Sequence, residues 1–236
     1  MIKNIPKSFF KTSTNNNIKY YSQTNFRKSI LKIIADQHTN VCFMNKDLIW
    51  RITLTDRVLN GNIDKLIDAV LCEERFVVIS LLLYNYIWSI SHQNIIIIDK
   101  KQKSIIRFDP VGKIHPIHVS FAHKKVSLDD TLQKLFKSIQ LTSSYSFIKP
   151  TNYQQLFDIQ SLEVLNLFSS RKNEPNGWCV MWCAYLMHMK LLNQDIDIRD
   201  ILDFIRKKGR CQLHTIIKNY TAYWILNSKK TNTHNK

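Results

Sequence analysis

Cys179 opens an almost wholly apolar stretch, CVMWCAYLMHMKLL, directly after the turn-forming residues Pro175, Asn176 and Gly177. Such a stretch predicts a helix that is buried on all sides and begins at or next to the cysteine. At a helix start, unpaired N–H groups and the helix dipole favour the thiolate, and the same N–H groups can hold an oxyanion. Cys179 is therefore our candidate nucleophile, although buried cysteines are often inert. Cys183, one turn further on, is predicted to be a core residue.

His92 and Asp109 flank a predicted β-hairpin. His92 precedes the run IIIID, Asp109 follows the run SIIRF, and a charged turn, DKKQK, joins the two. His92 is predicted to lie just before the start of its strand. If strands Asn94–Ile98 and Ser104–Phe108 pair about Lys101, then His92 and Asp109 lie near each other. A neutral imidazole there can take a thiol proton and return it to a leaving amine, while a carboxylate orients the ring. Each residue alone is more often structural, but the three together favour catalysis.

The remaining pattern predicts the elements that must position these residues. Helices are predicted over 26–37, 62–73, 127–139, 197–208 and 211–226, and further strands over 75–83 and 145–148. The order favours an α+β fold in which a central mixed or antiparallel sheet packs on the buried helix that starts at Cys179. We predict an N-terminal helical extension over residues 1–74 with a poorly ordered start. A catalytic domain over 75–227 and a disordered tail over 228–236 follow.

The composition fits one well-cored domain, or at most two small ones. The chain has 236 residues, of which 44% are hydrophobic and 22% charged, as in ordinary globular proteins. Its net charge of +16 would attract nucleic acid, anionic membranes or acidic proteins, although AT-biased coding also produces Lys-rich surfaces. The chain has no compact basic run and no RNP, zinc-finger or bZIP pattern, so we expect loose, non-specific nucleic-acid association.

The cysteines point to a reducing, intracellular compartment. Their number, five, is odd, and the start MIKNIPKSFFKTSTNNN lacks the apolar region of a secretory signal. Cys179 is expected to react readily, whereas Cys183 and Cys211 should react only when the chain unfolds. The apolar stretch 76–98 is interrupted by polar residues such as Asn85, so we expect two buried strands and no membrane span.

No metal or other cofactor is expected. His115, His118 and His123 stand close together, but their segment offers no cysteine or paired carboxylate, and we predict solvent-exposed loop residues. His188 lies within the buried helix and is predicted to be a hydrogen-bonded core residue.

The order of His92, a strand, a charged turn, a second strand ending at Asp109, and then Cys179 resembles the adenovirus-protease and SUMO-protease clan of cysteine peptidases. The sequences of two segments, HQN-IIIID-KKQKSIIRFDPVG and GWCVMWCAYLMHMKLLN, are most similar to those of clan members encoded by large DNA viruses of eukaryotes. The resemblance covers about residues 75 to 195, and it implies a papain-like, SUMO-protease-like fold.

The oxyanion donor differs from the pattern of the SUMO proteases, which carry a glutamine six residues before the cysteine. This chain has Asn173 at that position. The similar viral members carry a glutamine further upstream in Gln-x-x-Glu, which Gln160-Ser161-Leu162-Glu163 fits. An amide N–H is needed about 3 Å from the developing oxyanion, and we prefer Gln160 to Asn173 or to the backbone alone.

The resemblance implies thiol-dependent hydrolysis of a protein substrate, cut after a small residue such as Gly. The substrate is either a viral precursor or a ubiquitin-like conjugate, in a host cytoplasmic viral factory or a virion. Gly177, Trp178 and Asn94 are our candidate substrate-binding residues, with Trp178 either narrowing the substrate channel or only packing. Two alternatives stay open: an acyltransferase on the same scaffold, and a non-catalytic interaction module. The sequence does not indicate an oligomeric state.

Overall fold

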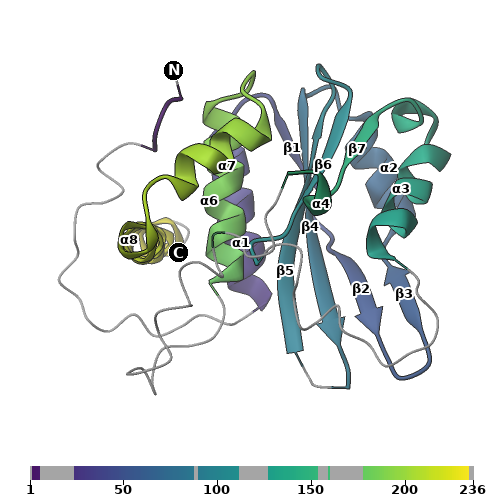
Figure 1. Cartoon of the computed structure of the whole chain (residues 1–236), viewed down its shortest axis with the longest axis horizontal. Coiled ribbons are helices and arrows are strands. Elements are labelled where there is room, and N and C mark those ends of the chain that lie inside the picture. Colours follow the sequence, from purple (N-terminus) through teal and green to yellow (C-terminus); the bar gives the residue numbers. More distant parts are fainter. Residues whose placement is uncertain are drawn as a thin grey trace.

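A mixed sheet lies between two layers of helices in the computed structural model (Figure 1), which describes residues 2–5, 24–87, 90–111, 127–153, 159 and 178–233. Its strands are β1 (Val41–Phe43), β2 (Leu48–Ile52), β3 (Arg57–Asn60), β4 (Phe76–Asn85), β5 (Ile90–Asp99), β6 (Ser104–Phe108) and β7 (Ser146–Ile148). The helices are α1 (Thr24–Asp36), α2 (Ile63–Leu71), α3 (Leu128–Ser138), α4 (Pro150–Tyr153), α6 (Cys179–Leu192), α7 (Ile198–Arg206) and α8 (Arg210–Thr233), with a 3₁₀ turn, η3 (Gln140–Thr142).

The described strands form one seven-stranded sheet in the order β3-β2-β4-β5-β6-β7, with β1 also paired to β4. The central strand β5 pairs antiparallel with both β4 and β6, whereas β1 and β2 run parallel to β4, and β7 runs parallel to β6. Strands β4 and β5 have neighbours on both sides and helices on both faces. This double burial explains why the run Ile95–Ile98 is apolar without alternation.

Two hydrophobic cores lie on opposite faces of the sheet. Helices α1, α6, α7 and α8 cover one face, and α2 and α3 cover the other (Figure 1). Successive side chains of β5 alternate between the cores, with Ile95 and Ile97 on the α6 side and Ile96 and Ile98 on the other. Helix α6 packs between the sheet and α8, so it is buried nearly all round. The sheet therefore holds the residues at the start of α6.

The predicted α+β class is confirmed, including the buried helix packed on the sheet. Strand β6 and helix α6 begin and end where the sequence predicted. Helix α3 is capped by Ser127, whose side chain accepts from the N–H of Asp130 at 3.3 Å, and α7 is capped by Asp197. Gly209 follows α7 at φ +72, a left-handed conformation that favours glycine.

The description of residues 1–74 as a helical extension is corrected. Helices α1 and α2 are present, but β1, β2 and β3 belong to the same sheet as β4. Strand β2 carries the period-two signal of a half-buried strand, because Leu48, Trp50 and Ile52 are buried. Helix α8 continues to Thr233, beyond the predicted start of the tail, because a polar composition does not itself end a helix.

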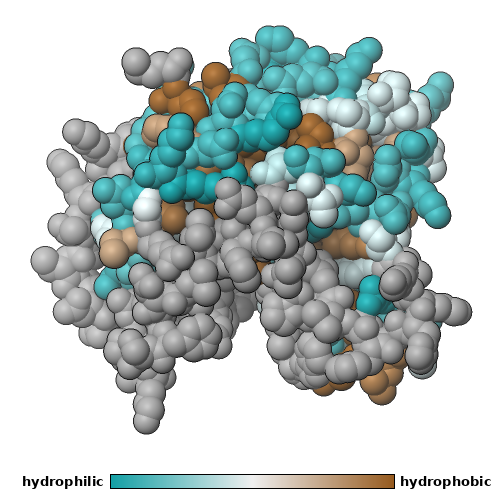
Figure 2. Space-filling model, viewed as in Figure 1, coloured by the Kyte–Doolittle hydropathy of each residue, from teal (hydrophilic) through white to brown (hydrophobic). Residues whose placement is uncertain are grey.

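The surface in Figure 2 is largely hydrophilic where the structure describes it, with smaller hydrophobic areas between the polar ones. Among the large apolar residues that remain exposed are Leu54, Val58 and Tyr86. None of the helices in the described part of the chain combines the length and the apolar character needed to cross a bilayer.

Candidate active site

Cys179 is the first residue of α6, and Trp178 is the N-cap. The N–H of Trp182 donates to the carbonyl of Trp178 at 2.8 Å. The backbone N–H groups of the first turn of a helix fall outside its regular bonding pattern, and the backbone of Val180 forms a hydrogen bond with the Cys179 sulfur. As the sequence predicted, the thiol stands where backbone donors and the positive end of the helix dipole meet.

Strand β5 fixes the first two turns of α6 through Gln93. The backbone of Gln93 forms a hydrogen bond with the sulfur of Cys179, and its carbonyl accepts from Cys183 Sγ at 3.4 Å. The side-chain amide of Gln93 is used inside the sheet, where it donates to Ser80 Oγ at 3.1 Å and to the carbonyl of Leu81 at 3.2 Å. A central strand thus positions the candidate nucleophile, and Gln93 is not the amide donor for an oxyanion.

His92 lies between Cys179 and Asp109 in one hydrogen-bonded cluster. Its Nε2 is 2.7 Å from Asp109 Oδ1, and its side chain also forms a hydrogen bond with Cys179. Because Nε2 faces the carboxylate, the bond to the sulfur falls to Nδ1. Asp109 Oδ1 accepts in addition from the N–H of Val111 at 3.1 Å. All three side chains are buried, so their interactions are screened little by water.

The hairpin register differs from the predicted pairing about Lys101. Asp99 pairs with Ser104, and Ile95 pairs with Phe108, the last residue of β6. His92 is paired with Leu83 of β4 instead, because β5 is longer than the predicted strand and follows β4 past the end of β6. His92 therefore lies within strand β5 and not before its start. Asp109, the residue that directly follows β6, contacts it there.

The two pKa values shift in the directions that an ion pair requires. Burial alone would lower the pKa of His92, but the charges of Asp109 and Cys179 and their hydrogen bonds to the ring raise it to about 10. Burial alone would raise the pKa of Cys179. The hydrogen bond and charge of His92, together with the backbone of Gln93 and Val180, lower it below its ordinary value. The site therefore favours a thiolate beside an imidazolium.

No family model matches the chain, and no curated protein matches it. Among solved structures, one described as "SUMO protease Ulp1 with the catalytic cysteine oxidized to a sulfinic acid" is similar to it. The similarity covers 93% of this chain and 84% of that chain, with 12% sequence identity and a TM-score of 0.39. A likeness this distant establishes no shared activity, so the case for a function rests on the residues of the cluster.

Arg107 lies behind Asp109 and was not predicted. Its Nη1 is 3.6 Å from Asp109 Oδ2 and donates to Asn94 Oδ1. Its Nε and Nη2 hold both carboxylate oxygens of Asp129 on α3, at 2.6 and 3.0 Å. One feature of the sequence could have predicted this ion pair: Arg107 is the single charged residue of the apolar strand SIIRF. A charge inside a buried strand needs a partner.

Replacing Arg107 with methionine should destabilise the fold strongly. The change leaves two carboxylates, the buried Asp109 and the half-buried Asp129, without their shared cation. Breaking a buried ion pair in this way costs about 3–5 kcal/mol, which urea unfolding would measure. The control is Arg199→Met, which removes a surface cation paired with Asp197 and should change the free energy of unfolding far less. Equal effects of the two substitutions would contradict this role of Arg107.

Two predicted substrate-binding residues are described, and both are buried. Asn94 is fully buried and bonded to Arg107, a position that suits support of Asp109 better than contact with a substrate. Trp178 is 6% exposed and belongs to the core on the α6 side, which fits the packing role that the sequence left open.

Several predicted residues lie outside the described part of the chain. They are Gly177, Gln160 and Asn173 of the candidate site, and the histidines His115, His118 and His123. Their roles stay predictions. His188 is buried, and its Nδ1 lies 3.2 Å from the hydroxyl of Tyr220, so it is the hydrogen-bonded core residue that was predicted.

Iodoacetamide should distinguish the cysteines by the pH dependence of alkylation. Cys179 should react well below pH 8.5, the ordinary pKa of a free thiol, because the hydrogen bond and charge of His92 lower its pKa. Cys183 is buried with a raised pKa and should react only on unfolding. Mass-spectrometric mapping of the labelled sites would measure both profiles.

Cys211 supplies the internal control for that experiment. The sequence led us to expect protection, but Cys211 lies in the first turn of α8 and is exposed, so it should react in the folded protein. The interpretation of Cys179 as an activated thiol fails if its pH profile of alkylation coincides with that of Cys211. It also fails if Cys183 is alkylated as fast as Cys179 in the folded protein.

Proposed function

We propose that the chain is a cysteine peptidase that hydrolyses an amide bond of a protein substrate through a thioester on Cys179. The observation that carries the proposal is the continuous hydrogen-bonded cluster of Cys179, His92 and Asp109 at the start of a buried helix. Side chains in this order supply a nucleophile, a base and a group that orients the base.

The reaction would proceed in two halves. The Cys179 sulfur, its proton held by His92, attacks the carbonyl carbon, and the resulting oxyanion lies against the backbone N–H groups at the start of α6. The imidazolium then gives its proton to the leaving amine, and the thioester remains. Water, deprotonated by His92, attacks the thioester and releases the carboxylic acid and the thiol. Asp109 stabilises the imidazolium in both halves.

The substrate class follows from the resemblance to the adenovirus-protease and SUMO-protease clan. We propose a protein cut after a small residue such as Gly, either a viral precursor or a ubiquitin-like conjugate. We also propose that the chain acts inside cells or in a virion, where its net charge of +16 promotes loose, non-specific association with nucleic acid.

The test compares the wild-type chain with Cys179→Ala. Each is incubated with a virus-infected and an uninfected cell proteome, and new N-termini are sequenced. The proposal expects a set of new N-termini, preceded by small residues, that requires Cys179. A peptidyl vinyl sulfone should label Cys179 alone in the folded protein. Slow, indiscriminate labelling without cleavage would favour a non-catalytic module, and transfer of an acyl group from acyl-CoA without cleavage would favour an acyltransferase.

Gln160 should contribute less than the triad residues. If its amide donates to the oxyanion, Gln160→Ala should lower the turnover of a cleaved substrate by roughly 10²–10³-fold, as the loss of one such donor does. The matched control is Asn173→Ala, the other candidate amide, which should leave turnover nearly unchanged. The reverse result would assign the amide donor to Asn173, and two unaffected variants would assign the oxyanion to the backbone alone.

A further inference from the structure

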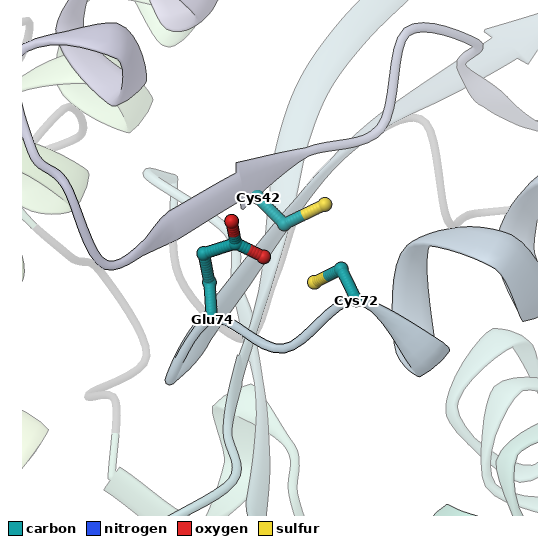
Figure 3. Close-up of side chains that lie close together, drawn as sticks. All are labelled: Cys42, Cys72 and Glu74. Atoms are coloured by element: carbon teal, nitrogen blue, oxygen red, sulfur yellow. The ribbon is translucent and has the colours of Figure 1, made fainter.

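A second group of reactive side chains lies away from His92, at the other end of β5. Cys42 on β1, Cys72 at the C-cap of α2 and Glu74 before β4 turn their ends toward a common space (Figure 3). The two sulfurs and a carboxylate oxygen all lie within 4.8 Å of one another. No other three such side chains meet in this way among the residues that the structure describes.

The sheet brings these residues together from distant parts of the chain. Strand β1 pairs parallel with β4, so that Cys42 stands beside Val77, and the N–H of Phe76 donates to the carbonyl of Asn40 at 3.0 Å. The chain reaches β4 from α2 through Cys72 and Glu74. All three side chains are half-buried, and both sulfurs pack against the core that α2 and α3 cover.

We propose that Cys42, Cys72 and Glu74 bind one thiophilic divalent cation of the zinc class. Thiolates and carboxylates are zinc ligands, with metal–sulfur distances near 2.3 Å and metal–oxygen distances of about 2.0–2.2 Å. In a tetrahedral site, these lengths put the ligand atoms roughly 3.5–4 Å apart, so side-chain adjustments of about 1 Å close the site. The cation replaces the two thiol protons, which pass to solvent, and water fills the fourth position.

Lys100 completes the charge balance of the site. Two thiolates, one carboxylate and a divalent cation carry one net negative charge. The Lys100 ammonium lies 3.6 Å from Cys72 Sγ and donates to the carbonyl of Cys72. Its backbone N–H donates to the carbonyl of Arg75 at 2.9 Å, so the turn after β5 holds it in place. Lys100 is therefore an outer partner of the ligand that it touches.

The position of the site indicates a structural role. His92 and Asp99 are separated by seven residues of β5, or roughly 23 Å at about 3.3 Å per residue, and Lys100 follows Asp99. The cation would thus tie β1 to the α2–β4 connection without contact with Cys179. A bound cation stabilises the folded chain by a free energy that grows with the logarithm of its concentration relative to its Kd.

Cobalt binding to the full chain tests the proposal directly. The Cys179→Ala variant is used under reducing conditions, because Cys179 and His92 together offer a competing pair of ligands. One equivalent of Co²⁺ should give thiolate-to-cobalt absorption with a tetrahedral ligand-field spectrum, Zn²⁺ should bleach it, and Zn²⁺ should raise Tm. Cys42→Ser with Cys72→Ser should abolish the absorption and the rise in Tm, whereas Cys211→Ser, at an exposed cysteine, should leave both intact.

Two lysine variants refine the test. Lys100→Met should weaken zinc binding by about 10–100-fold, as the loss of an outer partner does. Lys101→Met, whose ammonium pairs with Asp195 instead, should leave it unchanged. The proposal is overturned if the reduced protein gives no cobalt absorption, or if the absorption survives the double serine substitution. It is equally overturned if Cys42 and Cys72 prove to form a disulfide in a chain that binds no metal when reduced.

Discussion

Cys179→Ala should abolish turnover while leaving the free energy of unfolding nearly unchanged. The loss should be on the order of 10⁶-fold, as when the nucleophile of a catalytic triad is removed, because alanine has no sulfur to attack the substrate. Little side-chain volume is lost, and the substitution removes the free-energy cost of burying a charged thiolate. The free energy of unfolding should therefore stay the same or rise slightly. The measurements are turnover of a cleaved substrate and a melting curve.

The matched control is Cys211→Ala, which removes the exposed thiol of α8. It should change neither turnover nor Tm. If the Cys179 variant retains activity, or if the Cys211 variant loses as much, then this chain is not the enzyme proposed here.

The triad could be proposed from the sequence because each of its members stands close to a strongly patterned segment. The apolar run after Cys179 allowed only a buried helix, and the two apolar runs around a charged turn allowed only a hairpin. Those two patterns suffice to place His92 near Asp109. They do not predict the length of β5, because the residues of β5 before Ile95 pair with β4 and not with its hairpin partner β6.

The missed features depend on contacts between segments that are distant in the chain. Strands β1 and β3 are short, and their pairing with longer strands, more than their own composition, makes them strands. The ion pair of Arg107 with Asp129 joins β6 to α3, and no spacing rule links them. Cys42 and Cys72 likewise lack any metal-ligand spacing, so the sequence led us to expect no metal site, and only the parallel pairing of β1 with β4 brings the two thiols together.

Asp109→Asn should lower turnover by about 10²–10⁴-fold without unfolding the chain. Asparagine keeps the shape of the side chain but not its charge, and that charge is a main reason why the pKa of His92 is raised to about 10. Without it the pKa of His92 falls, and the imidazolium supports the Cys179 thiolate less well. The pH at which Cys179 begins to react with iodoacetamide should therefore move upward, toward that of an ordinary thiol.

That shift separates a catalytic role of Asp109 from a merely structural one, since loss of packing alone would not move the alkylation profile of a folded protein. Asp195→Asn, at an exposed carboxylate paired with Lys101, should leave turnover and profile unchanged. His92→Ala should be as inactive as Cys179→Ala, and the double variant should be no worse than either, because the residues act as one unit. An unshifted profile in Asp109→Asn, or a loss of activity in His92→Ala that circular dichroism traces to unfolding, would remove the triad from the mechanism.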